Sequence, residues 1–191
     1  MKHQDLYKLQ DNFYIQLEEI RKNLNFPAIA PEVGSLIYFL IDSLQLKNVL
    51  EIGSGYGHSA YWALKSLSLE HITLTEKKES LYTIFQTLSF PHQEKIQYFL
   101  GDALNYIETH DLSLLNFILI DGQKSLYLEY IQKIEHKITS GTLILLDNTL
   151  LERSITVSQS LEELHSYLST SSLFIKIFLP LSTGITLLRK I

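Results

Sequence analysis

Three oxygen-bearing side chains at the ends of two apolar segments suggest a site for a hard divalent cation. Asp121 follows the apolar run 116–120, and Asp147 and Asn148 follow a second run at 142–146. Carboxylate and amide oxygens suit Mg²⁺ or Ca²⁺ rather than zinc, and Mg²⁺ keeps waters that a substrate can displace. Asp and Asn are also common turn formers, so the residues alone leave a turn and a metal site as alternatives.

Lys124 lies three residues beyond Asp121, at the start of a predicted helix. A cation at a helix N-terminus opposes the helix dipole, so a structural reason for this lysine is not evident from the sequence. Next to a bound metal ion, a lysine is a candidate general base. An ordinary surface lysine is the alternative interpretation.

The stretch 51–59, Glu-Ile-Gly-Ser-Gly-Tyr-Gly-His-Ser, leads from an apolar run through a glycine-rich turn into a helix. The glycines would let the chain turn sharply and let a ligand approach the main chain, where the helix N-terminus offers free N–H groups. The spacing is G-x-G-x-G, not the G-x-G-x-x-G of dinucleotide-binding turns. A turn that binds nothing is the alternative, and we interpret His58 as a packing residue.

Two further acids follow predicted strands. Glu76 lies about 20 residues beyond Gly55, where an acid accepts hydrogen bonds from ribose hydroxyls in nucleotide sites. Asp102 and Ala103 follow the strand 96–100, where an adenine ring would lie against the sheet edge. The alternatives are a solvated acid or helix cap at Glu76 and a helix N-cap at Asp102.

Alternating strands and helices would bring these residues to one edge of a sheet, because ligands of open parallel sheets bind beyond the carboxyl ends of the strands. The apolar runs are continuous, as in parallel strands that helices cover on both faces. The predicted strands are 49–52, 71–76, 96–100, 116–121 and 142–146, the helices are 59–69, 78–89, a short one after 103, 124–138 and 158–168, and 173–179 and 185–189 form a closing hairpin.

Two helices precede the first predicted strand. Apolar residues over 6–24 recur at steps of three and four, which is typical of an amphipathic helix. We interpret this helix as packed on its own domain; a dimer contact or an active-site cover are the alternatives. Two prolines interrupt the pattern, and a second helix follows at 32–44. The sequence therefore predicts a single domain, 1–191, with an N-terminal helix and linker at 1–30 and an α/β core at 31–191.

Composition excludes several classes of site. The chain has 191 residues, 46% hydrophobic and 19% charged, which is typical of a globular domain, and its formal net charge of −5 does not favour nonspecific nucleic-acid binding. The lack of cysteine excludes disulfides, thiolate zinc sites and iron–sulfur clusters. Neither an apolar signal core nor a run of about 18 apolar residues is present, so we expect a cytoplasmic protein with no membrane partner.

Four motifs together resemble the metal-dependent O-methyltransferases of the catechol and caffeoyl-CoA O-methyltransferase type, which use S-adenosylmethionine (SAM). The motifs, in the order and separation of that family, are Ala30–Gly34, Glu51–Ser59, Asp121–Lys124 and Asp147–Asn148. The resemblance covers about residues 27–190. It implies a Rossmann-like, doubly wound, mostly parallel seven-stranded sheet with an antiparallel C-terminal hairpin and helices on both faces, in a homodimer.

The resemblance also implies roles for individual residues. Mg²⁺ would be coordinated by Asp121, Asp147 and Asn148, and Lys124 would take the proton from the substrate hydroxyl. Asp121 is thereby implied in catalysis and in cofactor binding as well. The residues implied to hold SAM are Gly53, Ser54, Gly55 and Ser59 at its methionine end with Glu51 beside them and Val33 contributing main chain, Glu76 at the ribose, and Asp102 and Ala103 at the adenine.

The chemistry implies an acceptor with two adjacent oxygens. A phenol-like hydroxyl has a pKa of about 10, and a metal ion bound to its oxygen favours the anion, which then needs an in-line position to the sulfonium methyl. A hydroxylated, catechol-like small molecule is the leading prediction. The alternative acceptor is 5-hydroxyuridine at the wobble position of tRNA, which some bacterial relatives of this family methylate. An NAD(P)-dependent oxidoreductase and a catalytically silent SAM-binding partner protein are alternatives of other classes.

The sequence departs from the family pattern near the acceptor site. Ser140-Gly141-Thr142 replaces the usual Pro-Gly-Gly, and the segment after Asn148 lacks the insertion that shapes the acceptor pocket in the plant-type enzymes. A pocket with few walls suits a large acceptor such as tRNA. The candidate basic contacts for RNA are Arg21, Lys22, Lys124 and Arg153.

Overall fold

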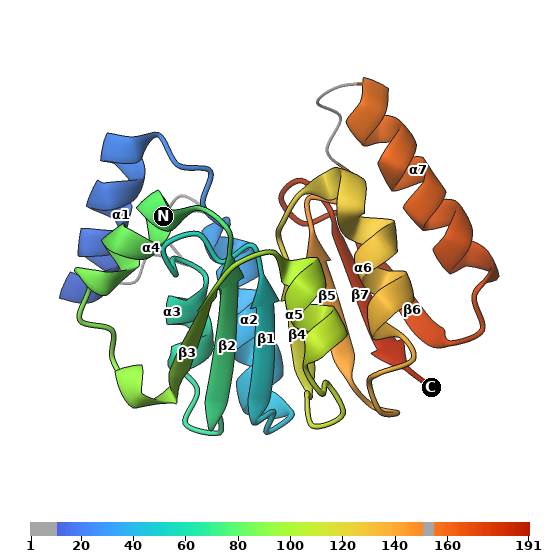
Figure 1. Cartoon of the computed structure of the whole chain (residues 1–191), viewed down its shortest axis with the longest axis horizontal. Helices are drawn as coiled ribbons and strands as arrows, with labels where there is room; N and C mark the ends of the chain where they lie inside the picture. The colour runs from blue at the N-terminus through green and yellow to red at the C-terminus, as the bar shows by residue number, and fades with distance from the viewer. Residues whose placement is uncertain (1–10, 151–154) are drawn as a thin grey trace.

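The protein folds into a seven-stranded sheet with helices on both faces (Figure 1). The structure is a computed structural model that describes residues 11–150 and 155–191. The strand order is β3-β2-β1-β4-β5-β7-β6. The first five strands are parallel, and β7 runs antiparallel to both β5 and β6. This confirms the predicted sheet and its C-terminal hairpin. The strands are β1 Asn48–Ile52, β2 His71–Glu76, β3 Ile96–Leu100, β4 Phe117–Ile120, β5 Leu143–Asp147, β6 Phe174–Leu179 and β7 Ile185–Lys190.

The helices divide between the two faces of the sheet. One hydrophobic cluster contains buried residues of α1 to α4, and a second contains buried residues of α5 to α7. Among the described residues, no helix has the length and apolar character needed to cross a membrane. The helices are α1 Asn12–Leu24, α2 Pro31–Ser43, α3 Ala60–Leu64, α4 Glu79–Gln86, α5 Ala103–Thr109, α6 Tyr127–Ile134 and α7 Ile155–Thr170, with 3₁₀ turns η2 Gln93–Lys95 and η3 Lys124–Leu126.

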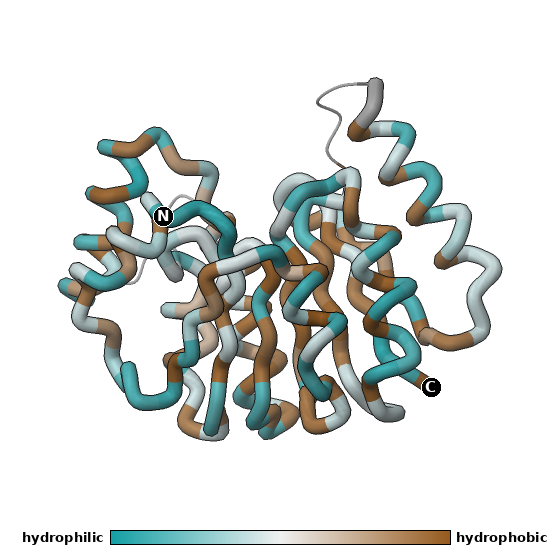
Figure 2. Tube along the Cα trace, in the orientation of Figure 1, coloured by the Kyte–Doolittle hydropathy of each residue, from teal (hydrophilic) through white to brown (hydrophobic). Residues whose placement is uncertain are grey.

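The central strands are buried on both faces, as their continuous apolar runs predict. In β4, Phe117 and Leu119 belong to the first cluster, whereas Ile118 and Ile120 belong to the second. Successive side chains of a strand point to opposite faces, so a strand between two layers of helices needs an apolar residue at every position. Figure 2 shows this as hydrophobic strands in the centre and mixed hydropathy along the outer helices.

Helix α1 packs on the domain to which it belongs. Its Leu17 is fully buried, and Phe13 and Ile20 pack against the first hydrophobic cluster. Asp11 caps the helix by accepting a hydrogen bond from the Tyr14 N–H at 2.9 Å. The predicted apolar residues Leu6 and Leu9 lie outside the described residues. The described part of this helix therefore adopts the packing that its periodicity predicts.

Three predicted helices are shorter than expected. The helix predicted at 59–69 ends at Leu64, the helix predicted at 78–89 spans Glu79–Gln86, and the helix predicted at 124–138 begins as a 3₁₀ turn and ends at Ile134. After Leu64, Ser66 Oγ donates to Asp42 Oδ1 at 3.0 Å and Ser68 Oγ donates to a carbonyl of α2 at 3.1 Å. Serine side chains that bond elsewhere compete with helix continuation, which periodicity alone does not reveal.

Candidate active site

The carboxyl ends of the parallel strands meet at a cavity of about 580 Å³, and a second cavity of about 160 Å³ lies beside it. Both are lined by Pro27, Ala28, Asp121 and Asn148, so the two spaces adjoin. The larger one is called the donor cavity and the smaller one the acidic cavity from here on. The sequence-predicted residues on their walls are Gly53, Ser54, Ser59, Glu76, Asp102, Ala103 and Lys124 in the donor cavity, Asp147 in the acidic cavity, and Asp121 and Asn148 in both.

Three residues of the implied SAM set do not line either cavity. Val33 is fully buried in α2, and Gly55 and Glu51 lie behind the wall. The wall on the α2 side is instead formed by the linker residues 26–29, which no sequence pattern marked. Cofactor-binding roles for these three residues stay predictions.

The first glycine of the loop is required by close packing. Gly53 has φ +86°, and a Cβ at this position would lie 2.6 Å from Gly122 Cα. The N–H groups of Gly53 and Ser54 both donate to the Thr75 carbonyl at 3.0 Å. The loop after β1 is thus held against the turn after β4 and the end of β2, because no side chain separates the backbones.

Glu51 is a buried acid with one unused oxygen. Its side chain is 1% exposed; the Ser59 hydroxyl donates to Oε1, whereas Oε2 has no hydrogen-bond partner among the described residues. Burial, assisted by the negative charges of Asp121 and Glu76, raises the pKa of Glu51 to about 8. A buried carboxyl oxygen without a donor fits a bound amino or ammonium group.

Glu76 is fixed between the glycine loop and α4. Its Oε1 accepts from the N–H groups of Lys77 and Lys78 at 2.9 and 2.8 Å, and its Oε2 accepts from the Gly55 N–H at 3.2 Å. The carboxylate still lines the donor cavity. Ligand hydroxyls that hydrogen-bond to Glu76 would therefore bind a carboxylate whose orientation is already fixed.

Asp102 has the structural role that the sequence left open. Its Oδ1 accepts a hydrogen bond from the Leu104 N–H at 2.8 Å and so caps α5. Asp102 and Ala103 also line the donor cavity. Capping and ligand contact are therefore compatible at this position.

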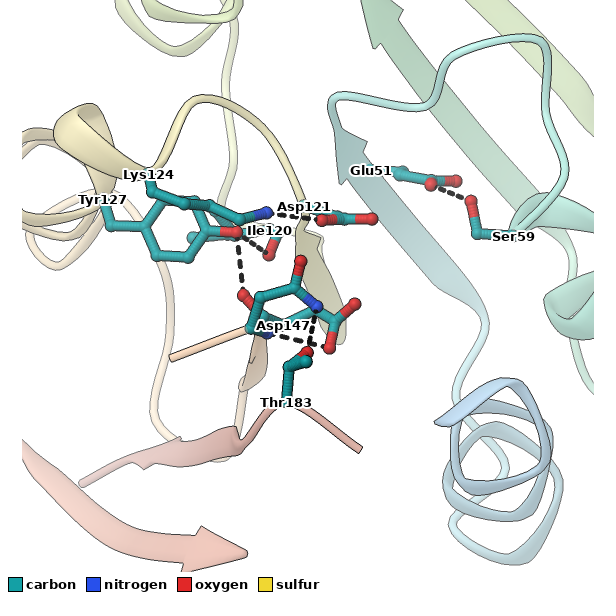
Figure 3. Close-up of polar contacts among 9 residues, drawn as sticks. Glu51, Ser59, Ile120, Asp121, Lys124, Tyr127, Asp147 and Thr183 are labelled. Atoms are coloured by element: carbon teal, nitrogen blue, oxygen red, sulfur yellow. Dashed lines mark hydrogen bonds and ion pairs between the residues drawn. The ribbon is translucent and has the colours of Figure 1, made fainter. Parts of the chain in front are cut away.

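The acidic cavity brings together the carboxylates of Asp121 and Asp147, which Figure 3 shows, and the amide of Asn148. Asp147 is 2% exposed, and burial together with the negative charge of Asp121 raises its pKa to about 7. The Asn148 amide nitrogen donates to Thr183 Oγ1 at 2.8 Å, which leaves the amide oxygen as the atom available to a cation. No group of three or more His, Cys, Asp or Glu side chains suited to a metal ion occurs in the described part of the chain. Two neighbouring carboxylates and an amide oxygen fit a hard divalent cation that also keeps waters.

Lys124 has a partner that the sequence did not reveal. Its Nζ lies 2.7 Å from Asp121 Oδ1 and packs over the Tyr127 ring at 5.2 Å from the ring centroid (Figure 3). The ion pair supplies a structural reason for this lysine that is not evident from the sequence. The side chain also lines the donor cavity, where it is 14% exposed.

Tyr127 connects the ends of the two acidic strands. Its hydroxyl lies 3.0 Å from the carbonyls of both Ile120 and Asp147 and donates to one of them at a time. Burial, with the charges of Asp121 and Asp147, raises the pKa of Tyr127 well above its ordinary value, so the hydroxyl stays protonated. Sequence analysis missed this residue, although its place three residues after Lys124 on one helical face is a usable signal.

Of the basic residues considered for RNA, Lys124 lines the donor cavity, whereas Arg21 and Lys22 line neither cavity. Arg21 is bound to Glu18 on α1, with Nε 3.0 Å from both carboxylate oxygens. Arg153 lies outside the described residues. The lysines that line the donor cavity, besides Lys124, are Lys77 and Lys78.

Comparisons with known proteins agree on one family. The family model described as O-methyltransferase matches residues 10–191. A catechol O-methyltransferase from Niastella koreensis is 24% identical over 83% of this chain and 75% of its own length, and a caffeoyl-CoA O-methyltransferase from Stellaria longipes is 22% identical over 92% and 83%. The solved structure of the O-methyltransferase TomG from Streptomyces achromogenes, in complex with SAM, has a TM-score of 0.83 and 18% identity, covering 100% of this chain and 99% of TomG. Because the family model spans nearly all of the sequence, this chain belongs to the O-methyltransferase family.

Proposed function

We propose that this chain transfers a methyl group from SAM to a hydroxyl that has a second oxygen beside it, with Mg²⁺ or another divalent cation bound at the acidic cavity. One observation carries the proposal. A cavity with a glycine-rich wall adjoins a cavity with two carboxylates and an amide, and Asp121 lines both. A methyl donor in the first and a chelating acceptor in the second would meet at Asp121.

The donor cavity suits SAM at three points. Ser59 lines the cavity and donates to the buried Glu51, whose Oε2 has no partner among the described residues, so this part of the wall fits the α-amino group of the methionine end. Glu76 fits the ribose hydroxyls, and the wall at Asp102 and Ala103 leaves space for adenine. The solved structure of TomG, which shares this fold, contains bound SAM.

The acidic cavity suits a divalent cation. Burial and the negative charge of Asp121 raise the pKa of Asp147, so a cation that compensates both carboxylates would bind favourably. Such an ion, when bound, stabilises the anionic form of an oxygen that it contacts. Two adjacent oxygens on the acceptor would chelate it together, which favours a catechol-like molecule.

Lys124 is the proposed base. The acceptor oxygen forms a bond to the methyl carbon while the carbon–sulfur bond breaks, and the hydroxyl proton passes to Lys124 Nζ and then to water. In the described arrangement Lys124 is paired with Asp121 at 2.7 Å. A divalent cation at Asp121 would compete for the same carboxylate, and its positive charge would favour loss of the Nζ proton to water, so that a neutral amine faces the acceptor.

The acceptor is identified by methyl transfer from labelled SAM to a catechol panel and to total tRNA from a strain that lacks this protein. We expect label in the catechol pool with Mg²⁺ and none with a chelator. Label in tRNA alone would show that the acceptor is tRNA and that the methyl-transfer chemistry is as proposed. Lys77 and Lys78, which are exposed and line the donor cavity, favour that alternative. Label in neither pool would contradict the proposal.

Two further measurements exclude the other classes. Calorimetric binding of NAD(P) in place of SAM would indicate an oxidoreductase. A silent SAM-binding protein would bind SAM and keep its cellular function in an Asp147→Ala variant, whereas the proposed enzyme would lose it. The homodimer and the cytoplasmic location implied by the resemblance stay predictions.

A further inference from the structure

Two neighbouring residues of α1 hold the two residues that flank the last glycine of the loop. The Tyr56 hydroxyl donates to the Leu17 carbonyl at 3.2 Å, and His58 Nε2 lies 2.9 Å from Glu18 Oε1. Between them, Gly57 has φ +89°. Residues far apart in the sequence thus fix the loop on both sides of a glycine with a positive φ.

Aromatic packing also confines the same glycine. A Cβ on Gly57 would lie 2.7 Å from Phe90 Cζ. Phe90 in turn packs edge-on against Phe13 of α1, with ring centroids 4.9 Å apart. The loop therefore lies between an aromatic contact and the polar contacts of α1, and its conformation depends on where α1 sits.

The Glu18–His58 pair is the polar part of this contact. The His58 side chain is 3% exposed and the Glu18 side chain 25% exposed. The hydrogen bond from His58 lowers the pKa of Glu18 to about 2, with Arg21 adding to the effect and burial opposing it. The His58 ring also lies 5.8 Å from the Tyr14 ring and 6.2 Å from the Tyr56 ring, centroid to centroid. A charge-assisted hydrogen bond in such surroundings is strongly directional.

The pair lies next to the surfaces that the methyl donor would contact. His58 lines the donor cavity. The next residue, Ser59, lines it too and donates to the buried Glu51. A shift of His58 would therefore move both the cavity wall and the hydroxyl that orients Glu51.

We propose that Glu18 and His58 are positioning residues for SAM binding, through which α1 holds the glycine loop in its ligand-binding conformation. This rests on the proposed use of SAM at the donor cavity. Holding the loop in advance removes the free-energy cost of ordering it when the ligand binds. The effect belongs to SAM affinity rather than to the methyl-transfer step, since Glu18 lines neither cavity and His58 does not line the acidic cavity.

The test compares SAM dissociation constants by calorimetry for wild type, Glu18→Ala, Glu18→Gln and Glu19→Ala. Glu19 is the matched control, because it removes the same charge from the next, exposed position of α1. We expect about a tenfold weaker Kd for Glu18→Ala, an intermediate loss for Glu18→Gln, which keeps an acceptor oxygen for His58, and no change for Glu19→Ala. At saturating SAM, kcat should stay within about twofold of wild type.

Coupling between the partners is tested by adding His58→Ala. If both residues act through their mutual bond, the double variant Glu18→Ala/His58→Ala should bind SAM no more weakly than the worse single variant. Additive losses would overturn the proposal, as would wild-type affinity in folded Glu18→Ala.

A ligand-free readout separates positioning from general stability. Amide hydrogen exchange of residues 54–60 without SAM should accelerate in Glu18→Gln and stay unchanged in Glu19→Ala. If Glu18→Ala does not fold, Glu18→Gln carries the comparison, and unchanged exchange and affinity there overturn the proposal. Failure of the wild-type protein to bind SAM would instead contradict the proposed function itself.

Discussion

The two adjoining cavities are built on opposite physical principles. The donor cavity takes its shape from close backbone packing, such as the contact of Gly53 with Gly122, and from acids fixed by neutral donors. The acidic cavity is dominated by Asp121 and Asp147, whose negative charges repel one another. The first is therefore shaped before any ligand binds, whereas the second gains most from a bound cation. Changes in the donor cavity should alter affinity and folding, except at Lys124, which lines this cavity but pairs with Asp121. Changes at Lys124 and in the acidic cavity should alter chemistry and metal response.

The largest effect is expected at Lys124. In Lys124→Ala, methyl transfer should fall by about 100-fold or more, because the acceptor proton loses its base, while the Kd for SAM stays within about twofold. Transfer from labelled SAM and calorimetry measure the two quantities. Lys133→Ala, which removes an exposed lysine paired with Glu108, serves as the control and should transfer normally. An equal loss in both variants would contradict a specific role.

Glu51 should make stability fall as pH rises. Its folded pKa of about 8 exceeds the ordinary value of 4.5, so its contribution is complete below about pH 4.5 and is lost as pH rises through about 8. In Glu51→Gln the SAM-free protein should lack this decline, which is on the order of 5 kcal/mol, while SAM binds more weakly. Urea unfolding across pH 4.5–9 measures it.

Exposed Glu70 provides the control for that pH profile. Glu70 pairs with Lys47 at the surface, so Glu70→Gln should keep the decline of wild type. The same slope in Glu51→Gln and wild type would show that Glu51 does not titrate as its burial implies.

Added Mg²⁺ should stabilise the protein through the acidic cavity alone. At a concentration of 100 times its Kd, the ion should raise the free energy of unfolding by about 2.7 kcal/mol, because it binds the folded state. Asp147→Asn should abolish this gain, whereas Glu51→Gln in the donor cavity should retain it. Thermal unfolding at constant ionic strength checks this prediction. An equal gain in stability in Asp147→Asn would show that the ion binds outside the acidic cavity.

Two glycine variants test whether close backbone packing shapes the donor cavity. Gly53 and Gly141 have similar positive φ angles, +86° and +95°, but a Cβ on Gly141 would meet nothing within 4 Å. Gly141→Ala should cost about 1 kcal/mol for backbone strain alone, and Gly53→Ala about 1–2 kcal/mol more for the contact with Gly122. Urea unfolding of both variants checks the difference. Equal costs would show that close packing does not shape the loop.

Local patterns were sufficient for most of the fold. The five parallel strands lie within about one residue of their predicted bounds, because a strand covered on both faces needs an uninterrupted apolar run. Helix ends were less predictable. The end of α3 depends on Ser66 and Ser68, which bond to α2 rather than to their own helix.

The sequence by itself determined the strand ends, the glycine-rich loop and the acids that follow the strands, since each depends on residues close together in the chain. Only the tertiary structure decided that residues 26–29 wall the donor cavity and that Tyr127 joins the ends of β4 and β5. It also decided the partners of Asn148 and His58, which are Thr183, 35 residues away, and Glu18, 40 residues away. Such contacts arise when separate elements pack, and the periodicity of one element carries no information about what will lie beside it.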